Sequence, residues 1–379
     1  MEYEEDAVVC QVLIRQSLVE VEDLSTCAEM QKQDRAAGRR PRRMRELLIE
    51  IDAVSSMEID AALAEGRSSD SSRLRRRKTE SSTAHRRRPS GRQPVLDRQV
   101  IGPFEVIEKL AAGGMGCIYT ARDRVSGETV ALKVLTAERN QGIDTERFLR
   151  EARIACSLDH EGLVRGRSFG NDTGQPYFAM EFVKGESLKA RLAREGALPW
   201  RQALDIALRI ARTLEYVHDK GLIHRDIKPD NILLSDDGQV KLCDLGLARE
   251  VDLMTTVTQS GQAVGTPRYI SPEQARGEKS IDARADIYSL GITVFHMLTG
   301  RPPFEDTSGI VVLSRHLYDE VPRITSVDPR LDRRLDRIVA RMTRKLPSDR
   351  YAGAGPLVKA LESLVRQLAA ARPRGRRCA

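Results

Sequence analysis

The pattern of apolar and polar positions divides the chain into stretches of different character. Residues 7–65 carry apolar residues at helical spacing, residues 66–98 show no apolar periodicity, and residues 99–368 alternate between strand-like and helix-like patterns. Helical spacing predicts amphipathic helices, whereas short alternating or β-branched runs predict strands. We therefore predict a small helical module, a flexible linker, one larger domain of alternating strands and helices, and a disordered basic tail. Their predicted boundaries are 1–66, 67–98, 99–370 and 371–379.

The helical module contains an internal repeat with an offset of 35 positions. The aligned segments are Leu13–Glu20 with Leu48–Ser55, then Leu24 with Ile59, and Cys27 with Ala62. Each copy predicts a short helix, a tight turn and a second amphipathic helix. The repeat weakly resembles the paired helical repeats of bacterial secretion and pilus ATPases, some of which bind cyclic dinucleotides. It lacks their Leu-Gly opening and turn glycines, so we expect a docking or dimerising module.

The positive charge of the chain is concentrated in the linker. The whole sequence has a net charge of +7, but the segment from Arg67 to Arg92 carries ten Lys/Arg against Asp70 and Glu80. The remainder is therefore close to neutral. This Ser/Arg-rich composition is typical of a solvated, flexible linker, and we expect no specific nucleic-acid partner. Contact of the linker with acidic partners, a membrane surface or RNA is the open alternative.

Length and composition indicate a cytoplasmic protein with a substantial core. The 379 residues contain no apolar run near the ~18–20 residues that a membrane span needs. The segment Met1–Asp6 is acidic, unlike the start of a secretory signal. The six cysteines show no CxxC or Cys/His ligand spacing, so we predict reduced thiols rather than disulfides or a zinc site.

The segment His224–Asn231 contains the residues that phosphoryl transfer needs. Asp226 can accept the proton of an acceptor hydroxyl, Lys228 can neutralise charge on the transferred group, and Asn231 can hold a metal ion through its side-chain oxygen. His224 precedes this group, and we expect it to be structural rather than a proton shuttle.

Further parts of a nucleotide site lie on both sides of this segment. A predicted strand ending at Leu110 leads into Ala111–Tyr119, where small residues allow backbone N–H groups to approach phosphates. Lys133 lies in a second predicted strand, and Glu151 lies in a predicted helix, as its expected partner. Asp244 directly follows a third predicted strand.

Together these motifs resemble the bacterial (Hanks-type, eukaryotic-like) serine/threonine protein kinases over roughly residues 100–368. Ala111 stands where the family's glycine-rich loop has its first glycine, and Leu245 stands where the family usually has Phe. The resemblance implies an α+β bilobal fold, with a small antiparallel β lobe carrying one helix and a larger, mainly α lobe. It also implies binding of ATP with Mg²⁺, or with Mn²⁺ as an alternative.

The resemblance also implies a role for each residue of the site. The catalytic residues would be Asp226, Lys228, Lys133, Glu151 and Thr266. The metal ligands would be Asn231 and Asp244. The nucleotide contacts would be Leu110, Ala111, Ala112, Gly113, Gly114, Met115, Gly116, Cys117, Ile118, Ala131, Lys133, Met180, Glu181, Val183 and Leu233. Met180 would be the gatekeeper, and the backbone of Glu181 and Val183 would bind adenine.

Other family features concern regulation and architecture. The segment between Gly246 and Glu273 would be the activation loop, and an anion docking beside Arg225 would order it. We expect autophosphorylation at one of three residues in it, Thr255, Thr256 or Thr258. Glu273 and Arg350 would form a buried ion pair, and Asp286 would brace the catalytic loop.

The predicted function is that of a non-specific serine/threonine protein kinase in bacterial signal transduction. Its partners would be ATP, protein substrates carrying Ser or Thr, and a second copy of the chain. The alternative is a nucleotide-binding pseudokinase or scaffold whose main interaction module is the N-terminal repeat. Glu186 favours substrates with a basic flank, which would make the Ser/Arg linker a cis substrate.

Overall fold

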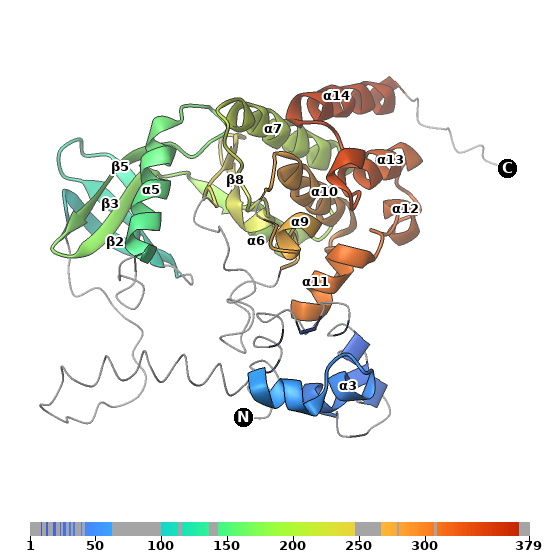
Figure 1. Ribbon diagram of the computed structural model, residues 1–379. Coiled ribbons are helices and arrows are strands. Elements are labelled where there is room, and N and C mark those ends of the chain that lie inside the picture. The colour runs from blue at the N-terminus through green and yellow to red at the C-terminus, as the bar shows by residue number, and fades with distance from the viewer. Residues whose placement is uncertain are drawn as a thin grey trace, which may run out of the picture. The chain divides into compact units, whose positions relative to one another are not determined.

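The computed structural model separates the chain into two compact units (Figure 1). One comprises residues 1–97, 252–267 and 306–315, and the other comprises residues 98–251, 268–305 and 316–379. The residues described are 100–112, 116–135, 143–246, 267–278, 280–306, 309–370, 42–62 and single positions between 9 and 39. The candidate site lies within the larger unit.

The larger unit begins with an antiparallel six-stranded sheet in the order β1-β2-β3-β4-β6-β5. Its strands are β1 (Val100–Ile101), β2 (Phe104–Ala112), β3 (Gly116–Asp123), β4 (Thr129–Leu135), β5 (Gly166–Asp172) and β6 (Gln175–Glu181). Helix α5 (Ile143–Ser157) packs against β5 and β6, as Figure 1 shows. Phe148 and Ala152 of α5 are buried against Phe178 and Met180 of the sheet. The predicted small lobe with one helix is confirmed.

The rest of this unit is mainly helical. Its helices are α6 (Leu188–Glu195), α7 (Trp200–Asp219), η1 (Pro229–Asn231), α9 (Pro272–Ala275), α10 (Arg284–Thr299), α12 (Ile324–Val327), α13 (Arg333–Met342), η3 (Pro347–Asp349) and α14 (Ala354–Ala370). Helix α11 (Gly309–Tyr318) begins in the residue range of the smaller unit and ends in that of the larger one. Helix α7 repeats buried residues at helical spacing, including Ala203, Ala207 and Ile210. It packs against α10 and α14 to form the core of the lobe. The predicted larger helical lobe is also confirmed.

A second, three-stranded antiparallel sheet carries the residues around the catalytic loop. It consists of β7 (Gly185–Ser187), β8 (Ile232–Ser235) and β9 (Val240–Leu242) in that order. Strand β8 begins directly after η1, and β9 ends two residues before Asp244. Ile232 pairs with Leu242 across the two strands. This pairing brings the segments that contain Asn231 and Asp244 together.

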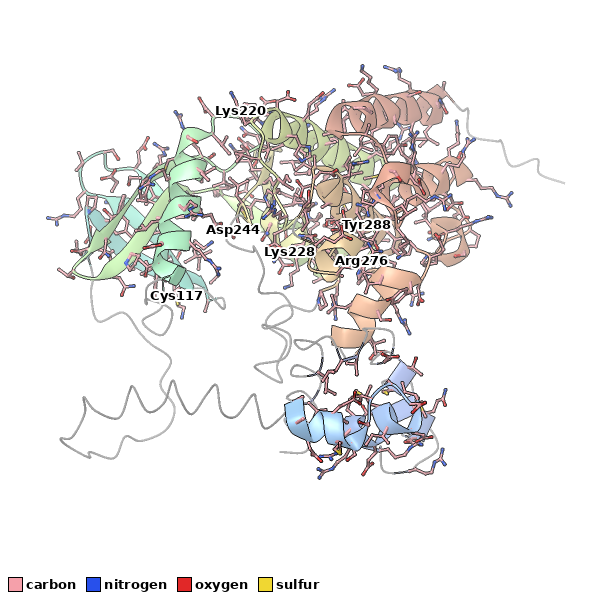
Figure 2. All side chains as sticks on the ribbon, in the orientation of Figure 1. Cys117, Lys220, Lys228, Asp244, Arg276 and Tyr288 are labelled. Carbon is pink, nitrogen blue, oxygen red and sulfur yellow. The ribbon has the colours of Figure 1, made fainter. Side chains whose placement is uncertain are left out.

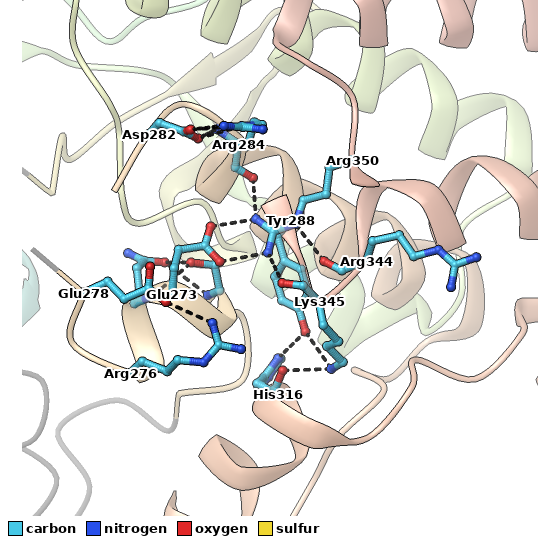
Figure 3. A network of polar contacts seen from close by, with 12 residues as sticks. Glu273, Arg276, Glu278, Asp282, Arg284, Tyr288, His316, Arg344, Lys345 and Arg350 are labelled. Atoms are coloured by element: carbon cyan, nitrogen blue, oxygen red, sulfur yellow. Dashed lines mark hydrogen bonds and ion pairs between the residues drawn. The ribbon is translucent and has the colours of Figure 1, made fainter. Parts of the chain in front are cut away.

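A buried polar network joins the helices of the large lobe (Figure 3). The guanidinium of Arg350 donates to both carboxylate oxygens of Glu273, at 2.6 and 2.8 Å. It also donates to the carbonyls of Arg284, Arg344 and Lys345. These five contacts use all five N–H groups of an arginine. The predicted ion pair between Glu273 and Arg350 is confirmed.

The smaller unit has its own core, which includes helix α3 (Met44–Glu50). Buried residues recur at the predicted repeat offset: Val9 with Met44, Leu13 with Leu48, Val19 with Val54, and Cys27 with Ala62. The same turn closes both copies, because the N–H of Leu18 bonds the carbonyl of Leu13 and the N–H of Ala53 bonds that of Leu48. Such a bond across five residues is typical of a helix C-terminus. The internal repeat is therefore a structural repeat as well.

Candidate active site

The backbone of the catalytic loop is held by one buried carboxylate. Asp286, in the first turn of α10, accepts the backbone N–H groups of His224 and Arg225, each at 2.8 Å. His218 at the end of α7 approaches the same carboxylate at 2.9 Å. Arg225 has a φ of 65°, which non-glycine residues rarely adopt, so these bonds hold a strained turn. The bracing role predicted for Asp286 is confirmed.

Asp226 lies beside both of its predicted neighbours. Lys228 Nζ is 2.8 Å from Asp226 Oδ2. Asn231 Nδ2 donates to the same oxygen at 2.9 Å and to the backbone carbonyl of Asp226 at 2.8 Å. Since the amide nitrogen of Asn231 is committed to Asp226, its Oδ1 is the atom left to bind a cation. The geometry therefore brings together a carboxylate, an ammonium and an amide oxygen.

Asp244 lies at the turn that follows β9 and contacts the small lobe. Its Oδ1 is 2.6 Å from Nζ of Lys133 in β4. The charge of Lys133 keeps the pKa of Asp244 below its ordinary value despite burial, so the carboxylate is ionised. Figure 2 shows Asp244 and Lys228 near each other, between the sheet of the small lobe and the helices.

The ammonium of Lys133 is stabilised by acidic neighbours. Burial acts to lower the pKa of Lys133, but the charges of Asp244 and Glu151 outweigh it, and the net shift is upward. Lys133 therefore keeps its charge at neutral pH. The ion pair that the structure shows for Lys133 is with Asp244, and a direct pair with Glu151 remains a prediction.

A small cavity lies between α5 and the segment that contains Asp244. Its volume is about 20 Å³, close to the size of one water molecule. The lining residues are Glu151, Ala155, Leu158, Leu163, Val164, Phe178, Met180, Leu242, Cys243, Asp244 and Leu245. Burial raises the pKa of the Cys243 thiol well above its ordinary value, so this thiol is protonated and unreactive at neutral pH.

His224 is held in its neutral form, with both ring nitrogens engaged by the backbone. It is fully buried, and burial lowers its pKa below the ordinary value even though the nearby carboxylates act in the opposite direction. Its Nε2 contacts the carbonyl of Cys243 at 3.2 Å. The ring therefore links the catalytic loop to the segment before Asp244, which agrees with a structural role.

The structure describes the two strand ends that flank the glycine-rich loop, Ala112 on one side and Gly116 on the other. Ala111 and Ala112 end β2 and pair with Ile118 and Cys117 of β3. A Cβ on Gly116 would lie 2.2 Å from the carbonyl oxygen of Val134, so only glycine fits there. The tip residues lie outside the described residues: Gly113, Gly114 and Met115.

The hinge between the lobes contains a residue pair that sequence reasoning missed. Nζ of Lys241 in β9 lies 3.0 and 3.1 Å from the two carboxylate oxygens of Glu181 at the end of β6. The backbone N–H of Glu181 donates to the carbonyl of Arg165 at 2.8 Å. A contact from Glu181 to adenine would therefore use its carbonyl oxygen. The sequence did not mark Lys241 as a partner of Glu181, because the two residues lie 60 positions apart.

For the remaining predicted nucleotide contacts, the structure shows the element on which each residue lies. Ala131 lies in β4 and Leu233 in β8, both half-buried, whereas Leu110 is exposed at the end of β2. Val183 lies between β6 and β7. Thr266 and the threonines expected to be phosphorylated lie outside the described residues, so their roles stay predictions.

Glu186 does not present an open carboxylate. Its oxygens accept from Arg191 at 2.6 Å and from Arg194 at 2.6 and 2.8 Å. Hydrogen bonds from Arg194 and Arg191 lower the pKa of Glu186 to about 2. The basic-flank preference predicted from Glu186 therefore loses its physical basis. The two arginines were missed because nothing in the sequence marks them as partners.

Several known proteins are similar to this chain. PknL, a serine/threonine-protein kinase of Mycobacterium tuberculosis (strain ATCC 25618 / H37Rv), is 36% identical over 280 residues, covering 73% of this chain and 69% of PknL. PrkC of Bacillus subtilis (strain 168), also a serine/threonine-protein kinase, is 34% identical over 69% of this chain and 40% of PrkC. The probable serine/threonine-protein kinase SCO3848 of Streptomyces coelicolor is 38% identical over 68% of this chain and 39% of its own length. The chain thus spans about two fifths of several of these relatives.

Solved structures agree with the sequence matches. A mutant kinase domain of Mycobacterium tuberculosis PknI has a TM-score of 0.58 at 27% identity, covering 72% of this chain and 100% of that chain. Rad53 in complex with AMP-PNP has a TM-score of 0.56 at 29% identity, covering 68% of this chain and 64% of that chain. A family model described as protein kinase domain matches residues 104–373. The chain therefore belongs to the protein kinase family.

Proposed function

We propose that this chain transfers the γ-phosphoryl group of ATP to serine or threonine hydroxyls of proteins. The observation that carries the proposal is the convergence of Asp226, Lys228 and Asn231 with the pair Lys133–Asp244 in one unit. A decayed, non-catalytic family member would be expected to lack one of these groups. All five are present in this chain.

The residues divide the work of the reaction between them. Asp226 orients the acceptor hydroxyl and accepts its proton as the acceptor oxygen bonds the γ-phosphorus. The bond between that phosphorus and the bridging oxygen breaks at the same time, and ADP leaves. Lys228, 2.8 Å from Asp226, lies where it can neutralise charge on the transferring group. Lys133 would hold the α- and β-phosphates.

The oxygen donors fit a divalent cation of the Mg²⁺ type. Asp244 is an ionised carboxylate, and Asn231 has its amide oxygen turned away from Asp226. Hard cations prefer such oxygen ligands. When bound, the cation would neutralise the β- and γ-phosphates. Mg²⁺ is the first candidate and Mn²⁺ the alternative.

The setting of the activity follows from its substrate. ATP is available in the cytoplasm, and the described cysteines Cys27, Cys117, Cys156 and Cys243 carry free thiols, as a reducing compartment allows. Among the helices that the structure describes, none has the length and apolar character needed to cross a bilayer. The proposal has three further parts. The chain acts in bacterial signalling, it phosphorylates its own activation loop, and it associates with a second copy of itself.

Incubation of the purified chain with labelled ATP and Mg²⁺ tests the activity directly. We expect label on the chain and on added protein, with mass spectrometry placing part of it between residues 250 and 266. Asp226→Asn keeps the size of the side chain but removes the base, and should lower transfer at least 100-fold. Undiminished transfer by Asp226→Asn, or no magnesium-dependent ATP binding by calorimetry, would contradict the proposal.

A further inference from the structure

Helix α6 forms part of the surface beside the catalytic base. It starts after Ser187, whose hydroxyl caps the helix by accepting the N–H of Ala190, and it buries Leu188 and Leu192. The helix packs against η1, the short turn that ends in Asn231. Asn231 in turn bonds Asp226. A peptide that brings its hydroxyl to Asp226 must therefore lie close to α6.

Three cations of α6 neutralise the carboxylates on this surface. Lys189 Nζ lies 2.6 Å from Asp230, the residue before Asn231. Glu186 is held by Arg191 and Arg194, as described above. Arg194 also donates to Glu195 at 2.9 Å. Each carboxylate of this set, namely Glu186, Glu195 and Asp230, is therefore already paired with a cation.

Two of the three cations, Lys189 and Arg194, reach further into solvent than the carboxylates that they bind. The Lys189 side chain is 66% exposed and that of Asp230 is 38% exposed. For Arg194 and Glu186 the corresponding values are 57% and 24%. An ammonium group has three donors, and the Asp230 contact uses one of them. At Lys189 and Arg194, an incoming side chain thus meets hydrogen-bond donors with positive charge before it meets Asp230 or Glu186.

Stability alone does not account for this arrangement. Exposed ion pairs of this kind contribute little to folding. The helix is already stabilised by the Ser187 cap and by burial of its two leucines. Charge placed at the edge of a binding surface acts mainly on specificity, through attraction of one partner and repulsion of another.

We propose that α6 forms a subsite for acidic side chains that flank the phosphorylated serine or threonine, with Lys189 as the selecting residue. This inference rests on the proposed kinase activity and names its substrate class. An extended peptide advances about 3.3 Å per residue, so positions two to four away lie about 7–13 Å from the acceptor. A basic side chain there would be repelled by Lys189 and Arg194, whereas a glutamate could bind them.

Three peptide series test the subsite with the full chain and Mg²⁺-ATP. They share one serine and carry glutamate, glutamine or arginine at positions two to four on each side. We expect kcat/KM for the glutamate series to exceed that for the arginine series about tenfold, and the ratio to fall as salt is raised. Lys189→Met should bring the ratio towards one. Lys189→Glu should invert it, and Lys189→Arg should preserve it.

A distant ion pair provides the matched control. Arg167 binds Glu128 at 2.6 Å on the surface of the small lobe, and both side chains are exposed. Arg167→Ala should leave the glutamate-to-arginine ratio unchanged. Equal rates for all series, or a ratio that the Lys189 variants do not alter, would overturn the subsite alone. Absence of transfer to every series, including the glutamine series, would overturn the proposed function together with it.

Discussion

At the scale of single residues, the site depends on close backbone approach as much as on charged groups. Gly246 lies two positions after Asp244, the proposed metal ligand, and its N–H donates to the carbonyl of His224 at 2.8 Å. A Cβ at Gly246 would lie 2.9 Å from that carbonyl oxygen and 3.1 Å from Cβ of Asp226. The glycine therefore sets the distance between the base and the segment that carries Asp244.

Gly246→Ala should slow catalysis by displacing Asp226. A displacement of about 1 Å in a catalytic group lowers the rate on the order of 10²-fold. We therefore expect kcat of the Gly246→Ala variant to fall between about 10- and 100-fold. Steady-state kinetics with a peptide substrate measures the change. Gly353→Ala is the control, because a Cβ there meets no atom within 4 Å and the backbone has no positive φ. Equal loss of activity in both variants would contradict this account.

At the scale of elements, two strands from different lobes are joined beside the proposed nucleotide site. β9 continues towards Asp244, and β6 ends in the hinge residue Glu181. The pair Lys241–Glu181 links them through side chains that are 11% and 27% exposed. The backbone adds a further connection, because the N–H of Val164 bonds the carbonyl of Leu242 at 2.9 Å. The end of β6 and the segment that contains Asp244 are thus linked by both side chains and backbone.

Lys241→Met should weaken ATP binding more than it slows transfer. Without its cation, the hinge carboxylate would turn towards solvent and loosen the backbone that is expected to contact adenine. A partly buried pair is worth roughly 1–2 kcal/mol, which corresponds to an increase of about 5- to 30-fold in KM for ATP. Kinetics at varied ATP concentration measures this increase, and Glu181→Gln should reproduce most of it. A fall in kcat at unchanged KM would refute a positioning role.

At the scale of the whole molecule, one buried ion pair connects distant segments of the larger unit. Arg350 and Glu273 lie 77 positions apart, and the polar network that they form connects the α9 segment with the start of α10 and the turn after α13 (Figure 3). Neither side chain is exposed by more than 3%. A charge left alone at such depth is strongly unfavourable.

Arg350→Met should lower the free energy of unfolding by about 3–5 kcal/mol, because it leaves Glu273 buried without a cation. Denaturant unfolding monitored by circular dichroism measures the loss. The double variant with Glu273→Gln should lose less than the sum of the two single variants. Arg330→Met is the control, since Arg330 binds Asp328 while 90% exposed. If Arg350→Met lowers the free energy of unfolding no more than the control does, the network contributes little to stability.

The sequence by itself determined which catalytic groups are present and the order of the elements that carry them. Those features were readable because they are local: Asp226, Lys228 and Asn231 lie within six positions, and the 35-residue repeat shows in apolar spacing alone. Apolar periodicity fixes which face of a helix or strand is buried. The two-lobed α+β fold, which the resemblance to protein kinases implied, is confirmed.

Apart from the Glu273–Arg350 pair, which the family resemblance implied, only the tertiary structure decided which charged side chains bind each other. Lys133 meets Asp244 across 111 positions, Lys241 meets Glu181 across 60, and Lys189 meets Asp230 across 41. Each ion pair depends on how strands and helices pack, and a charged residue in the sequence has many partners within its reach. The sequence therefore defined the chemical groups of the candidate site, whereas packing defined the charge of the surface around it, because pairing over such distances is a property of the folded chain.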